Sequence, residues 1–141
     1  METDVKSLIE NAFKARENAY APYSNYYVGA ALLTRNGKIF AGCNIENASY
    51  GATICAERCA LFKGVSEGCR EFSAIAICGG LSHEKSILSD YAYPCGICRQ
   101  VLREFANPDK FKVYVAKSVD DYKEYTLSEL LPDSFGPDNL N

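Results

Sequence analysis

Two short cysteine motifs carry the residue types that point most directly to chemistry in this sequence. Cys55 opens the triplet CAE, and forty positions later Cys95 and Cys98 bracket the motif CGIC. Two cysteines three positions apart at the start of a helix can face one metal ion, and a cysteine at another helix start can supply one more thiolate. Three thiolates leave a tetrahedral zinc ion one ligand short, and catalytic zinc sites keep that position for water. The spacing therefore predicts one zinc ion per chain, bound by Cys55, Cys95 and Cys98.

Two charged residues follow the first of these cysteines. Glu57 is two positions from Cys55, so its carboxylate can reach the open position of the metal without occupying it. A carboxylate there can take a proton from water and return it to a leaving group. Because three thiolates outweigh the charge of one zinc ion, the helix N-termini and Arg58 are expected to offset the excess, with Arg58 donating to the sulfurs. Arg58 could equally form a surface ion pair.

A closed structural zinc site is the plainest alternative, and it would need a fourth ligand. The one histidine of the sequence, His83, lies in a long polar segment. Seven cysteines are an odd number, which disfavours a complete disulfide framework. We interpret the four cysteines outside the motifs as small buried side chains, the usual role of an unpaired cysteine. They are Cys43, Cys59, Cys69 and Cys78.

Each cysteine motif is predicted to open a helix. The run CAERCALFK, residues 55–63, is rich in helix formers, and Gly64 offers a stop. Pro94 suits the first position of a second helix, whose apolar residues continue at helical spacing until the Asn-Pro pair at 107–108. A further amphipathic helix is expected near the N-terminus, with Thr3 as its N-cap. The cysteines would then lie at two helix starts.

The segments between the helices are typical of strands. The Asn-Gly pair at 36–37 is the strongest short hairpin signal, and the apolar run SAIAIC is typical of a strand buried on both faces. Strands that alternate with helices predict crossover connections and a sheet whose faces are covered by helices. A helical turn is expected at 127–131. The predicted strands cover residues 27–33, 38–43, 73–78 and 111–116.

The size and composition are those of an ordinary globular domain. A chain of 141 residues can bury a core of its own, so we expect one domain over residues 1–141, ending in an extended tail from about residue 132. The apolar fraction of 48% and the charged fraction of 23% are far from the composition of disordered chains.

The charge of the chain limits its partners. Polynucleotide binding depends on Lys and Arg neutralising phosphates, so a net charge of −3 disfavours nucleic acid. No apolar run approaches the roughly 18 residues of a membrane span, and the N-terminus is not organised like a signal peptide. We expect a soluble cytoplasmic protein that does not bind membranes.

Further blocks give the sequence a resemblance to the small homotetrameric cytidine deaminases, a zinc-dependent family whose site is formed by Cys-x-Glu and Pro-Cys-x-x-Cys motifs. The resemblance extends through nearly the whole chain and implies a three-layer α/β/α sandwich. Its mixed sheet would have about five strands, with helices on both faces. The additional blocks are APYS at 21–24, VGAAL at 28–32, NIENASY at 44–50 and LLPDSFGP at 130–137.

The same resemblance implies roles for individual residues. Asn44 and Glu46 would hydrogen-bond the ribose hydroxyls, although from the residues alone they could equally end a strand. Tyr26 would lie near the base, at a position where the family usually has Phe. Tyr50 and Phe135 would reach into the site of a neighbouring subunit of a homo-oligomer, a tetramer, although Phe135 could also cover its own core. The substrate-binding residues implied in this way are Asn44, Glu46, Tyr26, Ala56, Tyr50 and Phe135.

The reaction implied by the resemblance is the hydrolysis of free cytidine and deoxycytidine to uridine and deoxyuridine. Water attacks C4 of cytosine, Glu57 protonates N3, and ammonia leaves. The partner is a small nucleoside, and no organic cofactor is required. Two other functions stay open: a deaminase of another small or polymeric cytosine substrate, and a non-catalytic module stabilised by zinc. The net charge of −3 disfavours a polynucleotide substrate. A non-catalytic zinc module would have no use for Glu57 beside an open metal position.

Overall fold

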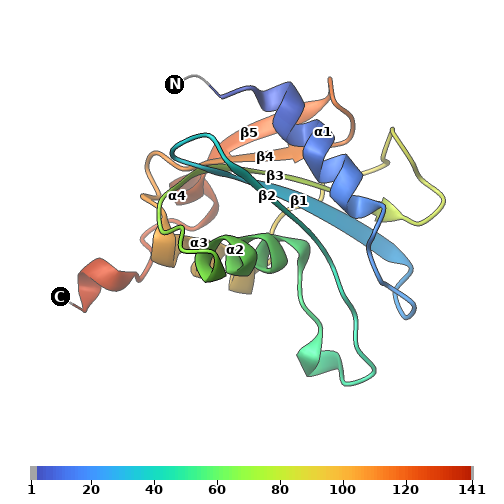
Figure 1. Cartoon of the computed structure of the whole chain (residues 1–141), viewed down its shortest axis with the longest axis horizontal. Helices are drawn as coiled ribbons and strands as arrows, with labels where there is room; N and C mark the ends of the chain where they lie inside the picture. Colours follow the sequence, from blue (N-terminus) through green and yellow to red (C-terminus); the bar gives the residue numbers. More distant parts are fainter. Residues whose placement is uncertain (1–2, 141) are drawn as a thin grey trace.

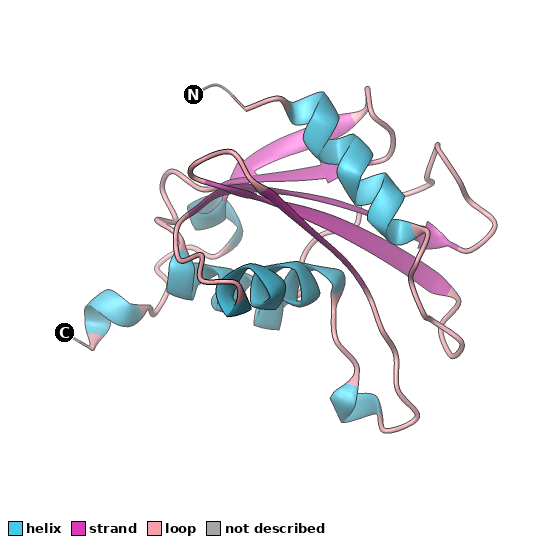
Figure 2. Ribbon diagram, in the orientation of Figure 1, coloured by secondary structure: helices cyan, strands magenta, loops and turns pink. Residues whose placement is uncertain are grey.

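A five-stranded sheet forms the centre of the structure, a computed structural model that describes residues 3–140. Helices cover both of its faces (Figures 1 and 2). The elements in chain order are α1 (Val5–Arg16), β1 (Tyr26–Thr34), β2 (Ile39–Cys43), the short helix η1 (Tyr50–Ala52), α2 (Ala56–Ser66), β3 (Phe72–Leu81), α3 (Gly96–Phe105), β4 (Lys112–Ala116), β5 (Tyr122–Thr126), α4 (Leu127–Leu130) and the short helix η2 (Pro137–Asn139).

The sheet is mixed, with strand order β2-β1-β3-β4-β5. Strand β1 runs antiparallel to both of its neighbours, β3 runs parallel to β4, and β5 closes the sheet antiparallel to β4. The carboxyl ends of β2, β3 and β4 therefore meet at one edge, together with the amino ends of β1 and β5. In open α/β sheets, ligands bind in a crevice outside the carboxyl ends of the strands.

The two faces of the sheet bury different side chains because residues alternate along each strand. In β3, Ile75 and Ile77 pack with residues of α2, α3 and α4, whereas Ala74 and Ala76 face α1. The small side chains on the α1 face allow that helix to lie close to the sheet. These layers confirm the predicted α/β/α sandwich.

Two helix starts differ from the sequence prediction. Asp4 caps α1, because its carboxylate accepts a hydrogen bond from the backbone N–H of Ser7 at 3.0 Å, and Thr3 does not. Helix α3 begins two residues after Pro94, because Cys95 has an extended backbone and is itself the N-cap. Because of this shift, Cys95 precedes the first turn of α3 as its N-cap, and Cys98 lies within that turn.

Gly64 does not end α2 as predicted. It lies inside the helix against Phe40 and Phe72, where a methyl group would come within 3.0 Å and 3.1 Å of the two rings. The glycine is therefore explained by close packing and not by a helix stop.

No helix among residues 3–140 has the length and apolar character needed to cross a bilayer.

Candidate metal centre and active site

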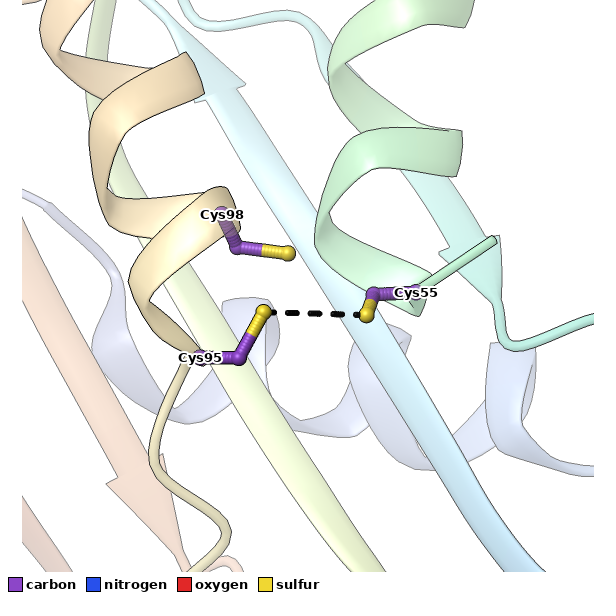
Figure 3. Close-up of side chains that lie close together, drawn as sticks. All are labelled: Cys55, Cys95 and Cys98. Carbon is purple, nitrogen blue, oxygen red and sulfur yellow. Dashed lines mark hydrogen bonds between the residues drawn. The ribbon is translucent and has the colours of Figure 1, made fainter. Parts of the chain in front are cut away.

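Three cysteine sulfurs converge where α2 and α3 begin (Figure 3). Cys55 is the N-cap of α2, Cys95 is the N-cap of α3, and Cys98 lies in the first turn of α3. The three sulfur atoms all lie within 4.8 Å of one another, and those of Cys55 and Cys95 are 3.9 Å apart. The topology explains this convergence, because both helices start from segments that leave the same edge of the sheet.

This donor set fits a zinc ion. Sulfurs at the usual Zn–S distance of about 2.3 Å on a tetrahedral centre are roughly 3.8 Å apart, close to the observed separation of Cys55 and Cys95. The free N–H groups and dipoles of two helix N-termini stabilise negative charge on the sulfurs. Cys55, Cys95 and Cys98 form the group of potential metal ligands found among the described residues.

Arg58 lies beside this centre. Its Nη2 donates a hydrogen bond to Cys55 Sγ at 3.4 Å, while its Nε is buried and has no hydrogen-bond partner among the described residues. The Cys98 sulfhydryl and then Arg58 lower the pKa of Cys55 to about 5, despite the opposing effect of burial. The pKa of Cys98 is raised, chiefly by its interaction with Cys55. A thiolate therefore forms readily at Cys55, which is the state that binds a metal.

Glu57 lies in the first turn of α2 and is only 5% exposed. Burial raises the pKa of its carboxyl to about 7, and the nearby charge of Cys55 adds to this effect. No ion pair found among residues 3–140 involves Glu57. A buried carboxyl beside the sulfurs can exchange protons with a group in the same space.

A cavity of about 340 Å³ opens beside the sulfurs. It contains the predicted residues Tyr26, Asn44, Ala56 and Glu57 together with two of the cysteines. The remaining lining residues were not predicted as site residues, although Val28 lies in the VGAAL block and Ile77 in the apolar run SAIAIC. The full lining is Tyr26, Val28, Asn44, Thr53, Ile54, Cys55, Ala56, Glu57, Ile77, Tyr91, Ala92, Tyr93 and Cys95.

Some of these missed residues could have been found from their positions in the sequence. Tyr91 and Tyr93 immediately precede the second cysteine motif, and large aromatic side chains next to metal ligands are candidates for the wall of a site. A larger hollow of about 580 Å³ lies between α1 and residues 82–86, but none of the three cysteines lines it.

Asn44 follows β2 and holds the start of β1. Its Oδ1 accepts a hydrogen bond from the backbone N–H of Val28 at 2.9 Å, and its Nδ2 donates to the carbonyl of Tyr26 at 2.8 Å. The side chain also lines the cavity. The amide therefore has a structural role at the end of the strand as well as a place in the site.

Glu46 does not line the cavity. Its carboxylate accepts hydrogen bonds from the backbone N–H groups of Tyr23 at 2.9 Å and Ser24 at 3.1 Å, and from the Ser24 hydroxyl. These bonds, chiefly the one from the Ser24 hydroxyl, lower the pKa of Glu46. The structure thus places Glu46 against the turn before β1.

Tyr50 and Phe135 are not part of the cavity wall of their own chain. They are 75% and 59% exposed. The Tyr50 ring packs edge to face on Tyr23, with centroids 5.9 Å apart. Two large aromatic side chains are therefore left without a core to cover.

The C-terminal segment, predicted to be an extended tail, is held against α3 by side-chain contacts. Arg103 of α3 donates to the Ser134 hydroxyl and forms an ion pair with Asp138, both at 2.8 Å. Gln100 of α3 donates to the carbonyl of Phe135 at 2.9 Å. These contacts hold the backbone around Phe135 against α3, while the Phe135 ring remains exposed to solvent.

A three-sulfur metal centre and a buried carboxyl in one cavity, at the carboxyl edge of an α/β sheet, define a zinc enzyme of the α/β class. Comparison with known proteins supports the assignment to a zinc enzyme. The family model described as the cytidine and deoxycytidylate deaminase zinc-binding region matches residues 2–115. The chain therefore belongs to this family, and zinc binding is a property of the domain.

Similar proteins span the whole chain. A cytidine deaminase from Halalkalibacterium halodurans is 48% identical over 138 residues, which cover 98% of each chain. One from Sporosarcina psychrophila is 46% identical over 138 residues, covering 98% of this chain and 96% of that protein. The crystal structure of a cytidine deaminase from Burkholderia pseudomallei, 47% identical, superposes with a TM-score of 0.83 and covers 95% of this chain and 100% of that one.

Proposed function

We propose that this chain hydrolyses free cytidine and deoxycytidine to uridine and deoxyuridine, with release of ammonia, in pyrimidine salvage. The observation that carries the proposal is the position of Glu57, a buried carboxyl in the same cavity as two of the three metal-binding cysteines. Membership of the deaminase family supports the reaction class. The similar proteins named above are called cytidine deaminases, which supports the nucleoside as substrate.

Each group in the site has a task in this reaction. Cys55, Cys95 and Cys98 hold the zinc ion, which when bound supplies a Lewis acid that makes water a nucleophile near neutral pH. Glu57 takes a proton from the water and gives it to N3 of cytosine, then takes the remaining proton of the hydroxyl added at C4 and delivers it to the departing ammonia. Arg58 donates to Cys55 and offsets the negative charge of the thiolates.

The cavity wall suits a planar base attached to a sugar. Tyr26, Tyr91 and Tyr93 supply aromatic surface, and Ala56 lies beside Glu57 at the start of α2. Asn44 offers an amide for a ribose hydroxyl. Glu46, which does not line the cavity of its own chain, would accept a hydrogen bond from a ribose hydroxyl in addition to those from the turn at Ser24.

The site is completed by neighbouring subunits in our proposal. The exposed rings of Tyr50 and Phe135 would each enter a neighbour's cavity in a homotetramer. The chain would act as one domain in the cytoplasm, with the C-terminal segment serving to present Phe135.

The proposal is tested by following product formation with purified protein. Uridine and ammonia should appear in equal amounts from cytidine, while cytosine in single-stranded DNA should not be converted. Cys95→Ala should abolish turnover, whereas the matched control Cys69→Ala, a partly buried cysteine packed on the core outside the site, should retain it. A protein that forms no uridine, or that prefers the polymer, would contradict the proposal.

A further inference from the structure

The C-terminal segment is attached to α3 chiefly through one buried arginine. Arg103 is only 9% exposed, and it donates from Nε to the Ser134 hydroxyl and from Nη2 to Oδ1 of Asp138, both at 2.8 Å. The hydrogen bond from Arg103 lowers the pKa of the Asp138 carboxyl, so the carboxylate stays charged at neutral pH. Three positions earlier in α3, Gln100 donates to the carbonyl of Phe135 at 2.9 Å. Two side chains of one helix thus hold residues 134–138 at three points.

Gly136 lies directly against the Arg103 guanidinium. It is buried, whereas Phe135 beside it is exposed. A methyl group at Gly136 would lie 2.4–2.7 Å from Cζ, Nη1 and Nη2 of Arg103. The guanidinium is held by its hydrogen bonds to Ser134 and Asp138, so it cannot withdraw without losing them. The close approach of the segment to Arg103 therefore requires a glycine.

The same contact sets the direction of the Phe135 ring. The backbone of Gly136 is extended, with φ −153° and ψ −176°, and successive side chains of an extended chain point to opposite sides. Since Gly136 faces Arg103, the Phe135 side chain points away from α3. None of the ring contacts found among residues 3–140 involves Phe135. The segment itself, in red in Figure 1, stands out from the helical layer.

We propose that Arg103 is a positioning residue for the active site of a neighbouring subunit: by holding residues 134–138 on α3, it directs the Phe135 ring to the cytosine base in that subunit's cavity. This inference rests on the proposed function, because it assumes that Phe135 completes a neighbour's site. Arg103 lies in the same helix as Cys98, yet its effect on turnover is exerted in another chain.

The first test measures the kinetics of two variants that weaken the contact from opposite sides. Arg103→Met keeps the length of the side chain, and because Asp138 is exposed, no buried charge is left without a partner. Gly136→Ala leaves Arg103 in place but displaces its guanidinium. Both should raise KM for cytidine roughly threefold to thirtyfold with little change in kcat, since a stacked ring contributes to binding in the ground state and the transition state alike.

Two readouts separate this role from damage to the variant's own site. Zinc content should stay at the wild-type level, whereas a disturbed metal centre would lose zinc and lower kcat. Arg70→Met is the matched control, because Arg70 also holds a loop, through the carbonyls of Val65 and Cys69, but away from every residue assigned to the site. It should leave KM unchanged.

The decisive test places the effect in one chain or the other. Adding Arg103→Met to Phe135→Ala should raise KM no further, because the ring that the arginine positions is already gone. Co-expression of an Arg103→Met chain with a Glu57→Ala chain should restore sites of wild-type KM, since the second chain supplies a correctly held Phe135. Co-expression with a chain that carries both Glu57→Ala and Arg103→Met should restore none.

The outcomes distinguish this inference from the proposed function. A normal KM in Arg103→Met, beside a raised KM in Phe135→Ala, would overturn the role of Arg103 alone. Failure of the Glu57→Ala chain to restore sites of wild-type KM to the Arg103→Met chain would do the same. A normal KM in Phe135→Ala contradicts the shared site and this inference with it. A protein that does not convert cytidine contradicts the proposed function, and the affinities of the same variants for uridine, measured by calorimetry, then decide the role of Arg103.

Discussion

Glu57 is set apart from the other carboxylates of the chain by its surroundings. Glu57 is one of the few polar residues that are buried among those described; the others are Arg16, Thr34, Asn44 and Arg103. No ion pair found among residues 3–140 involves Glu57. Desolvation raises its pKa to about 7, so both protonation states are accessible near neutral pH. The start of α2 thereby places a carboxyl that can carry a proton beside the three cysteines, outside the group of potential metal ligands.

The first prediction concerns this residue. Glu57→Gln should retain zinc and lose turnover of cytidine by about 10²–10⁴-fold, the usual contribution of a general acid–base group. The change keeps the size of the side chain and removes its ability to carry a proton. Steady-state kinetics and metal analysis of the same preparation measure both effects. Glu67→Gln, an exposed residue just after α2, is the control. Near-normal turnover of the Glu57 variant would refute the role.

The sequence was most informative where chemistry restricts the choice of residue. Cys55, Cys95 and Cys98 could be predicted because three thiolates at two helix starts have few other uses, and the structure brings them together. Glu46 could not be placed, because its hydrogen bonds to the turn at Ser24 depend on how two loops meet.

At the scale of elements, the position of α1 depends on a single glycine of β1. A methyl group on Gly29 would lie 2.0 Å from the carbonyl oxygen of Ala12 and 2.6 Å from the backbone nitrogen of Arg16. Both atoms belong to the helix backbone and cannot move alone. Arg16 in turn donates to the carbonyls of Tyr27 and Gly80, which ties α1 to the edge of the sheet where the cavity lies.

The second prediction follows from this close approach. Gly29→Ala should destabilise the protein by about 1–3 kcal/mol or more, because the helix must move away from the sheet. Thermal or denaturant unfolding measures the loss. Gly51→Ala is the matched control, because nothing lies within 4 Å of its added methyl group. Equal stability of the two variants would show that α1 does not pack as described.

The helices and most strands could be predicted because their hydrophobic periodicity reflects the core they bury. Strand β3 stands out as an apolar run, and its residues 74–80 are buried. Strand β5 was not identified individually, although about five strands were expected, because its residues are polar or aromatic and largely exposed at the sheet edge. Gly64 was misread as a stop, since its reason lies in distant rings.

At the scale of the whole molecule, the exposed ring of Phe135 is a feature that a single chain leaves unexplained. The backbone around it is fixed on α3 by Arg103 and Gln100, so the ring is presented in a defined place. Burial of an aromatic ring of this size contributes substantially to an interface. We infer that its contact is made in another subunit.

The third prediction tests this inference by complementation. Co-expression of a Glu57→Ala chain with a Phe135→Ala chain should regenerate complete sites in mixed oligomers, because each chain supplies what the other lacks. Stacking of a base on an aromatic ring is worth about 1–3 kcal/mol, which is measurable in kinetics. The control pairs Phe135→Ala with a chain that carries both substitutions, and it should show no recovery. A monomeric mass in solution, or recovery no greater than in this control, would contradict a shared site.

The most direct test of the account is a zinc titration of metal-free protein with cytidine hydrolysis as the readout. Cys55, Cys95 and Cys98 form one ligand group per chain, so activity should rise linearly and stop rising at one zinc ion per chain. Uridine and ammonia should appear together at every point. Full hydrolysis of cytidine by protein shown to contain no metal, or a protein that binds zinc at this stoichiometry and forms no uridine, would contradict the claim that this chain is a zinc-dependent cytidine deaminase.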